Sequence, residues 1–379
     1  METVALLLGV QPIRIGGVEF FTRELALQLA SHGWRLVAIF GGPPTPKVAE
    51  FLALPNLSIE VVSTLEFSNL RSLPAVRRIL RKYRPRIFHF LFLDFIGPYP
   101  WLAKLQSVDR IFFTAQGSNP SDYVPRRSAF WKRIATRLIN FPLDRAFCVS
   151  DYVRQCLVTQ NLLPAPRFQR IYNAIPLPTL HPQQDAAAAA SFRSRFHIPA
   201  DRQLVVQVSW IIPEKGIADM IDAAKLVLLR NPRAHFAFVG SGDSIEHFRT
   251  RVEELGIADS VTFTGLLENP MSEGVFPAAD VFCLASRWQE AFGWVITEAM
   301  SFRKPVVATR VGGIVEIIRH GETGFLVPPQ DPASLAEAIL QLLDHPRRRE
   351  MGDAARREVE QRFDLRHMVK ELVQAYAIG

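Results

Sequence analysis

Residues 281–298, VFCLASRWQEAFGWVITE, decide how this chain folds. The β-branched and apolar run from Val281 to Leu284 predicts a buried strand, and the polar residues after it predict a loop. That loop turns at Phe292-Gly293 into a predicted helix that carries Glu298. In such a strand, loop and helix, the first helical N–H groups point into the loop, where the helix dipole favours an anion. The stretch therefore predicts a site for a group such as phosphate.

Two carboxylates lie on either side of that helix start. Glu290 stands in the loop, and Glu298 follows eight residues later, at most about 12 Å along a helix. Carboxylates only accept hydrogen bonds, so the pair suits a ligand with hydroxyl groups at both ends and a phosphate between them. A sugar nucleotide is such a ligand. The alternative is a pair of surface carboxylates on an ordinary α/β crossover, because this spacing also arises by chance.

Length and composition limit the class of protein. The chain has 379 residues, of which 48% are hydrophobic and 21% charged, so we expect an ordinary globular protein with two domains. Cys148, Cys156 and Cys283 lack metal-site or disulfide spacing, which favours buried free thiols in a reducing compartment. The apolar run at residues 4–10 is too short for a signal peptide or a membrane span. We therefore expect a cytoplasmic protein.

Positive charge is concentrated in the first half of the chain. Residues 1–175 contain 22 Lys and Arg against 11 Asp and Glu, whereas the remainder contains 22 against 26. This half should face an anionic partner. Residues 73–83 and 126–141 combine basic with apolar side chains at helical spacing. They are either sheet-packing helices with a solvated face or peripheral contacts with an anionic membrane at its inner face. For residues 73–83 a contact with a polyanion is also open. Nucleic-acid binding is not expected, because no recognition motif accompanies the charge.

Apolar strands alternate with amphipathic helices along both halves. This pattern predicts an α/β fold with two Rossmann-like domains facing across a cleft. The predicted boundaries are a first domain at 1–178, a proline- and alanine-rich linker at 179–203, a second domain at 204–362, and a C-terminal helix at 363–379 that packs back toward the first domain. The predicted strands are residues 4–10, 36–40, 87–92, 111–114, 145–149, 168–172, 204–208, 236–239, 261–264, 281–284 and 305–308.

Short motifs follow one another along nearly the whole chain. They are Gly16-Gly17, Val149-Ser150, Tyr172-Asn173-Ala174, Pro213-Glu214-Lys215-Gly216, Gly240-Ser241-Gly242, Glu290 and Glu298 with Phe292-Gly293 between them, KPVVAT at 304–309, Gly312-Gly313 with Glu316, and GETGFL at 321–326. No single motif is specific, but their order is. In this order the chain resembles glycosyltransferase family 4, a family of retaining enzymes with the GT-B architecture. The resemblance implies an acceptor-side N-terminal domain and a C-terminal domain that binds a nucleotide sugar.

The resemblance also implies residue roles. Glu290 would hold hydroxyls of the donor sugar, Glu298 the ribose hydroxyls, and Lys215 the diphosphate. Breaking a glycosyl phosphate bond builds negative charge on the departing diphosphate, so a fixed lysine and a helix N-terminus stabilise the transition state more than the ground state. The catalytic candidates are Glu290, Lys215 and Gln116. The donor-binding candidates are Glu298, Gly16, Gly17, Phe292, Gly293, Gly240 and Trp210.

Two positions depart from the family pattern. Gln116 stands where the family commonly has a histidine, and glutamine cannot accept a proton as histidine does. Trp210 stands where the family usually has an arginine that contacts the diphosphate, and an indole cannot replace a bidentate guanidinium. Either Arg14 or Arg287 supplies the second cation, or turnover is weak or absent. Apart from a contact with base or lipid, Trp210 is expected to be a core or cleft-lining side chain.

Two functions follow as hypotheses. The first is a metal-independent, retaining transfer of a hexose from a nucleoside-diphosphate sugar to a hydroxyl of a glycan or lipid-linked acceptor. No Asp-x-Asp metal motif is present, so no metal or other cofactor is expected beyond the donor. The second, motivated by Gln116 and Trp210, is a non-catalytic protein that binds a sugar nucleotide or glycan on the same scaffold.

Overall fold

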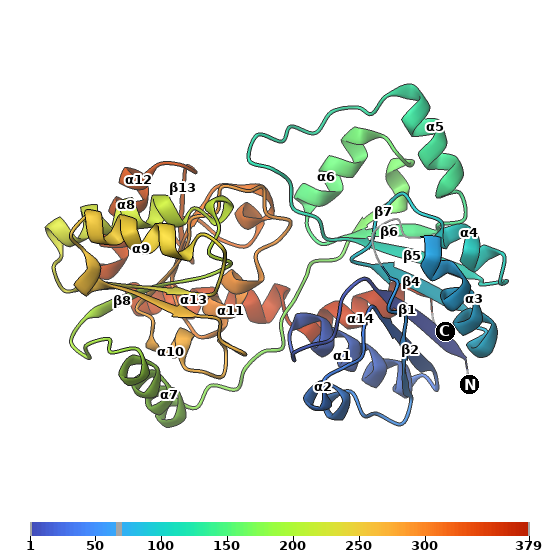
Figure 1. Ribbon diagram of the computed structural model, residues 1–379, viewed down its shortest axis with the longest axis horizontal. Helices are drawn as coiled ribbons and strands as arrows, with labels where there is room; N and C mark the ends of the chain where they lie inside the picture. The colour runs from blue at the N-terminus through green and yellow to red at the C-terminus, as the bar shows by residue number, and fades with distance from the viewer. Residues whose placement is uncertain (1, 66–69, 378–379) are drawn as a thin grey trace. The chain divides into compact units, whose positions relative to one another are not determined.

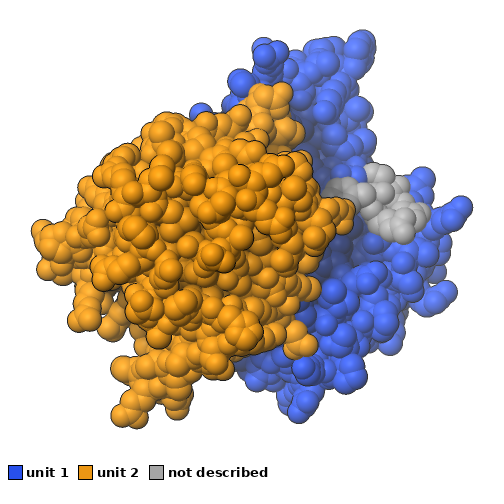
Figure 2. Space-filling view, turned by 60° about the vertical axis from the view of Figure 1, so that its left-hand side comes forward, with its two compact units in different colours: residues 1–117, 124–176, 365–379 blue, residues 118–123, 177–364 orange. Residues whose placement is uncertain are grey.

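The computed structural model describes residues 2–65 and 70–377. Figure 1 shows the course of the chain through alternating helices and strands. Contacts divide it into two units, which Figure 2 colours separately. Unit 1 contains residues 1–117, 124–176 and 365–379, and unit 2 contains residues 118–123 and 177–364. Each unit is built on one sheet of parallel strands.

The unit 1 sheet has seven strands in the order β3-β2-β1-β4-β5-β6-β7. Its central strands are fully buried, as expected when helices cover both faces of a parallel sheet. The strands are β1 (Thr3–Leu8), β2 (Arg35–Phe40), β3 (Leu57–Val61), β4 (Ile87–Leu91), β5 (Arg110–Ala115), β6 (Arg145–Cys148) and β7 (Phe168–Arg170). The α-helices are α1 (Gly17–Ser31), α2 (Pro46–Phe51), α3 (Leu73–Tyr83), α4 (Tyr99–Lys104), α5 (Phe130–Ile139), α6 (Asp151–Gln160) and α14 (Leu365–Ala375).

Helix α14 completes the core of unit 1. Its buried Leu365, Val369, Leu372 and Val373 and the following Tyr376 join the cluster formed by β1, β2 and α1. The Tyr376 hydroxyl lies 2.6 Å from Nδ1 of His89, a buried residue of β4, and the other ring nitrogen of His89 lies 2.7 Å from the Thr114 hydroxyl. Burial lowers the pKa of His89 to about 3, so the ring is neutral and links two hydroxyl groups.

The unit 2 sheet has six strands in the order β10-β9-β8-β11-β12-β13. All are parallel, and their core is filled mainly by aliphatic side chains from α8 and α12. The strands are β8 (Gln203–Val208), β9 (Ala234–Val239), β10 (Val261–Gly265), β11 (Val281–Leu284), β12 (Val306–Thr309) and β13 (Gly324–Val327). The α-helices are α7 (Pro182–Arg195), α8 (Ile217–Arg230), α9 (Ile245–Glu254), α10 (Val275–Ala278), α11 (Trp294–Ser301), α12 (Pro332–Leu343) and α13 (Arg348–Arg362).

Two segments differ from the predicted domain organisation. The predicted linker at 179–203 contains helix α7, which packs against α10 within unit 2. The predicted first domain, residues 1–178, includes Ser118–Tyr123, which contacts assign to unit 2. This segment is held in unit 2 by an antiparallel bridge, in which Asn119 and Gln289 exchange backbone hydrogen bonds of 2.9 and 3.0 Å.

Candidate functional site

The strand order of unit 2 reverses between β8 and β11. Strands β9 and β10 follow β8 to one side, and β12 and β13 follow β11 to the other. At such a switch point the loops after the two strands leave in opposite directions, and open α/β sheets bind ligands there. The loops concerned are residues 209–216, after β8, and residues 285–293, after β11.

The loop after β8 is folded so that Lys215 has a fixed backbone. A short 3-10 turn covers Pro213–Lys215, and the buried Gln207 side chain donates from Nε2 to the Lys215 carbonyl at 2.9 Å. Gly216 then adopts φ +66° and is the N-cap residue of α8. A Cβ on Gly216 would lie 1.8 Å from the Ala285 carbonyl oxygen. Glycine is therefore required here, because it lets the two switch-point loops touch.

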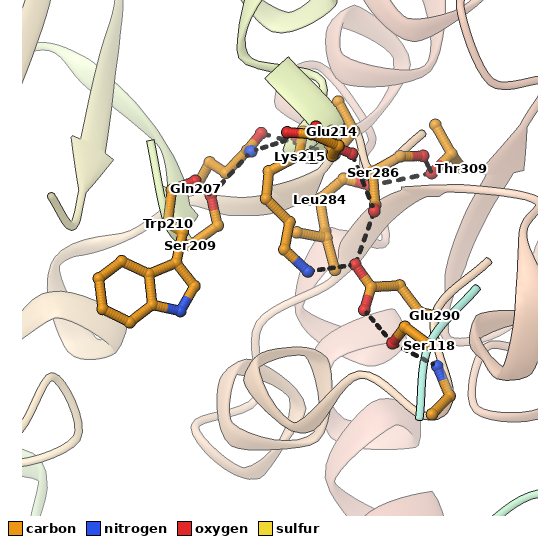
Figure 3. Close-up of polar contacts among 12 residues, drawn as sticks. Ser118, Gln207, Ser209, Trp210, Glu214, Lys215, Leu284, Ser286, Glu290 and Thr309 are labelled. Atoms are coloured by element: carbon orange, nitrogen blue, oxygen red, sulfur yellow. Dashed lines mark hydrogen bonds and ion pairs between the residues drawn. The ribbon is translucent and has the colours of Figure 1, made fainter. Parts of the chain in front are cut away.

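The two loops are joined by an ion pair. Nζ of Lys215 lies 2.6 Å from Oε1 of Glu290, and both side chains are largely buried (Figure 3). The Ser286 hydroxyl donates to the same Oε1 at 2.6 Å, and the Ser118 hydroxyl lies 3.4 Å from Oε2. The Glu290 carboxylate is thus held from three directions. In low-dielectric surroundings such fixed charges act more strongly than they do in water.

The backbone of Glu290 rests on the double glycine that follows β12. The N–H of Gly313 donates to the Glu290 carbonyl at 2.7 Å, and the N–H of Gly312 donates to the Gln289 side chain at 2.8 Å. Gly312 has φ +50°, and a Cβ there would lie 2.1 Å from the Glu290 carbonyl oxygen. The Gly312-Gly313 motif therefore positions the loop that carries Glu290.

Helix α11 begins beside this carboxylate. Gly293, with φ +126°, precedes Trp294, the first residue of the helix. The Phe292 ring is buried and packs edge-on against Phe363 at 5.4 Å between centroids, so the ring itself is not exposed for contact with a ligand. Glu298 lies on α11 and is half-buried. The predicted strand, loop and helix are therefore present in this stretch.

The remaining unit 2 candidates flank the ion pair. Trp210 lies two residues after β8 and its side chain is 59% exposed, so it is not a core residue; the cleft-lining alternative stays a prediction. Figure 3 shows its indole apart from Lys215 and Glu290. Gly240, at the end of β9, has φ +144°, and a Cβ there would lie 1.9 Å from the Ser209 carbonyl oxygen. It allows the loops after β8 and β9 to approach closely.

Arg287 is engaged elsewhere. Its Nε and Nη2 each donate to the buried Asp219 carboxylate at 2.7 Å, a bidentate pair that raises the pKa of the guanidinium. Arg287 could therefore contact a diphosphate, in place of the arginine that the family usually has at position 210, only if its pair with Asp219 were broken. Arg14, the other alternative, is exposed in the loop before α1.

Three sequence candidates belong to unit 1. Gly16 and Gly17 begin α1 after β1, and the Gly16 N–H donates to Glu19 Oε2 at 2.9 Å. Glu19 is buried, and this desolvation raises the pKa of its carboxyl group. Gln116 follows β5 at the same carboxyl edge of the sheet and is half-buried. Their roles toward a donor stay predictions.

Ser286 and Ser118 were missed by sequence reasoning. Ser286 is fully buried two residues after β11, and Ser118 directly follows Gln116-Gly117, three residues after the end of β5. A polar residue directly after a buried strand is the signal that could have identified them, since strand ends at the carboxyl edge carry ligand contacts.

Metal and membrane features were searched over residues 2–65 and 70–377. Within that range no three His, Cys, Asp or Glu side chains are grouped so as to hold a metal ion. Nor does any helix there combine the length and apolar character needed to cross a bilayer.

Comparison with known proteins identifies relatives of both units. The model "Glycosyltransferase Family 4" matches residues 15–177, and "Glycosyl transferases group 1" matches residues 190–358. N-acetyl-alpha-D-glucosaminyl L-malate synthase of Bacillus anthracis is 26% identical, with 96% of this chain and 94% of that protein covered. Alpha-D-kanosaminyltransferase of Streptomyces kanamyceticus is 31% identical over 53% of this chain, and the chain spans about half of that relative's length.

Solved structures show the fold along the full chain. HepE of Anabaena, solved in complex with UDP and glucose, superposes with a TM-score of 0.79 at 20% identity, covering 98% of this chain and 99% of that one. A glycosyltransferase from Rickettsia africae superposes with a TM-score of 0.80 at 21% identity, covering 99% and 98%. The predicted GT-B fold class is therefore confirmed.

Proposed function

Because the chain belongs to glycosyltransferase family 4, a retaining family with the GT-B fold, we propose that it transfers a hexose from a nucleoside-diphosphate sugar to a hydroxyl of a glycan or lipid-linked acceptor. The observation that carries this proposal is the contact of Lys215 with Glu290 across the unit 2 switch point. It brings one cation for a diphosphate and one carboxylate for sugar hydroxyls together beside the start of α11.

In this proposal, Lys215 binds the diphosphate of the donor and Glu290 accepts hydrogen bonds from the sugar hydroxyls. The N–H groups of Gly293 and the first turn of α11 face the same anion, and Glu298 accepts from the ribose. The bond between the anomeric carbon and the diphosphate oxygen breaks while the acceptor oxygen bonds to the same face of the sugar. The acceptor proton passes to the departing phosphate, so no protein base is required.

The preformed ion pair supports a role for Lys215 in the transition state. Glu290 and the serines around it hold the ammonium group in place before any donor arrives. A preorganised cation needs no rearrangement when charge develops on the leaving diphosphate, and removing one such donor typically costs about 3 kcal/mol of transition-state stabilisation.

The donor base and the working location are finer parts of the proposal. HepE of Anabaena was solved with UDP-glucose, and a relative from Mycobacterium tuberculosis is named as GDP-mannose-dependent. Because the structural relative covers the full chain, we propose a UDP-sugar as the first donor to test. We further propose that transfer needs no metal ion and takes place in the cytoplasm, at the inner face of the membrane.

The second candidate function is binding without catalysis. It is favoured by Gln116, by the indole at position 210, and by the occupation of Arg287 by Asp219. Because position 210 carries no cation and Arg287 is paired with Asp219, Lys215 is left as the charged partner of the diphosphate in the switch-point loops. This candidate predicts a bound nucleotide sugar and no product.

A donor panel followed by two variants tests the proposal. UDP-, GDP- and ADP-sugars are screened by thermal shift, since a ligand of the folded state raises the melting temperature. Donor hydrolysis or transfer is then measured for Lys215→Ala and Glu298→Ala, with the exposed Lys370→Ala as a matched control. We expect Lys215→Ala to lower kcat by about 10²- to 10³-fold and Lys370→Ala to leave it unchanged. Tight donor binding with no turnover over a broad acceptor panel would establish the second candidate instead.

A further inference from the structure

Helix α5 of unit 1 turns its apolar side outward. Phe130, Trp131 and Leu138 are 58%, 76% and 63% exposed, whereas the buried residue of the helix is the polar Thr136. The next residue on the inner side, Asn140, is also buried and donates from Nδ2 to the Phe95 carbonyl at 3.0 Å. A helix that packs only on its own unit would have the opposite orientation.

The outward side of α5 continues onto α4. The Trp101 ring stacks on Phe141, with centroids 6.3 Å apart and planes 17° apart, and its Nε1 donates to the Leu138 carbonyl at 2.9 Å. Leu105, one helical turn after Trp101, is exposed beside it. We name the surface formed by Trp101, Leu105, Phe130, Trp131, Leu138 and Phe141 the α4–α5 face.

The exposed aromatic side chains of the protein gather on this face. Among the large hydrophobic residues that are exposed in the described ranges, the aromatic ones are Trp101, Phe130, Trp131, Phe141 and Trp210, and four of them belong to the α4–α5 face. Soluble proteins rarely expose contiguous apolar patches of this kind unless the patch binds something.

Basic residues surround the same surface. Residues 124–141 contain Arg126, Arg127, Lys132, Arg133 and Arg137, and no Asp or Glu. Arg126, Arg127, Lys132 and Arg137 are exposed, and the Arg133 guanidinium lies over the Phe130 ring at 5.8 Å. The occupant of this surface should therefore be both apolar and negatively charged.

We propose that the α4–α5 face docks on the surface of an anionic lipid bilayer. A bilayer matches both properties, because aromatic and aliphatic side chains enter the boundary between headgroups and acyl chains while Lys and Arg contact anionic headgroups. Tryptophan is enriched at this boundary because its ring is apolar and its N–H is polar. This docking rests on the membrane location proposed above and names the surface responsible for it. Vesicle binding is measured without donor or acceptor, so its outcome is separate from that of the transfer assay.

Vesicle binding by the full chain tests the inference. Co-sedimentation is measured with vesicles of phosphatidylcholine alone and of phosphatidylcholine with an equal part of phosphatidylglycerol. We expect binding to the anionic vesicles, weakened by added salt, and little binding to the neutral ones. Lys132→Gln should weaken binding about fivefold. Leu138→Ser should weaken it about tenfold.

Two matched variants control for unspecific effects. Leu229 is an equally exposed leucine, 70% against 63%, on α8 of unit 2, and Lys370 is an exposed lysine on α14 of unit 1. Leu229→Ser and Lys370→Gln should bind like the unsubstituted protein, and all four variants should keep its melting temperature. Equal binding to both kinds of vesicle, or no effect of Leu138→Ser, would overturn the proposal. A dimer in solution that Leu138→Ser dissociates would do the same, since a second copy would then cover the face.

Discussion

The ammonium group of Lys215 lies 2.6 Å from a carboxylate oxygen of Glu290, although the two residues are 75 positions apart in the chain. They meet because β8 and β11 are neighbours at the point where the strand order reverses. The fold of the sheet, rather than any local motif, therefore brings the two charges together. The glycine at position 216 and the serine at position 286 then fix the geometry, and each can be tested separately.

Ser286→Ala should impair the reaction more than it impairs folding. The Ser286 hydroxyl donates to Glu290 Oε1 at 2.6 Å, and a hydrogen bond to a charged group contributes about 1.5–3 kcal/mol. If Glu290 holds the sugar, kcat/KM should fall about tenfold or more, chiefly through kcat. Steady-state kinetics measure this, with the exposed Ser272→Ala as the control. An unchanged kcat would show that Ser286 does not position a catalytic carboxylate.

Gly216→Ala should destabilise unit 2 far more than Gly256→Ala. Both glycines have positive φ, +66° and +64°, so alanine strains the backbone by about 1 kcal/mol at either position. Only at Gly216 would the new Cβ overlap another atom, the Ala285 carbonyl oxygen at 1.8 Å, whereas it meets open space at Gly256. Overpacking adds about 1–3 kcal/mol. Urea unfolding measures the difference, and equal losses in the two variants would contradict the close approach of the loops.

Lys304 should make stability depend on pH in the alkaline range. Burial, with help from Arg348 and Arg193, lowers the pKa of Lys304 from 10.5 to about 8. Between these two values the unfolded state binds more protons than the folded state, so the free energy of unfolding rises with pH across that window. The full effect corresponds to about 3 kcal/mol. Urea unfolding between about pH 7.5 and about pH 10.5 should show this rise, and Lys304→Met should abolish it.

The exposed Lys370→Met provides the comparison for that experiment. This substitution removes the same charge from a solvated position, so the free energy of unfolding of the variant should still rise with pH. A Lys304→Met protein with an unchanged slope would mean that the buried ammonium group is not its source.

Tyr376→Phe should weaken unit 1. The lost hydroxyl leaves a ring nitrogen of the buried, neutral His89 without its partner at 2.6 Å, which costs about 1–3 kcal/mol. Tyr83→Phe is the control, because its hydroxyl donates to Glu60 at a partly buried site that water can reach. Chemical denaturation should show the larger loss for Tyr376→Phe. If Tyr376→Phe lowers the free energy of unfolding no more than Tyr83→Phe does, the buried hydrogen bond to His89 contributes little to stability.

Hydrophobic periodicity in the sequence predicted most of the strands of the two sheets, but not the short or partly exposed ones. Helix α3 at Leu73–Tyr83 and strand β11 at Val281–Leu284 have the predicted bounds, because each has an unambiguous apolar period and a clear stop. Strand β3 is only half-buried, so its side chains are mixed, and β13 has four residues next to a glycine and prolines. Neither strand was predicted, because its sequence shows no clear hydrophobic periodicity. Helix α7 was missed because its polyalanine run lacks an apolar face.

Residue types in the sequence point to site chemistry where that chemistry is local, but not to contacts that arise only on folding. Glu290 and Lys215 stand in motifs whose residue types indicate their chemistry. The support of Glu290 by Ser118 comes from a residue 172 positions away, and no sequence spacing encodes it. The pairing of Arg287 with Asp219 depends on the start of α8 lying beside the loop after β11. Such contacts follow from the sheet order, which the sequence does not specify.

The position of α14 has a consequence for biosynthesis. A nascent chain that has reached Pro176 contains the seven strands of unit 1 but lacks residues 365–376, which pack on the apolar side of α1 and on His89 in β4. The ribosome needs roughly 10–40 s to make the intervening residues. During that interval the first unit exposes hydrophobic surface that chaperones can recognise, and its core is complete only after α14 has been synthesised and has packed on α1.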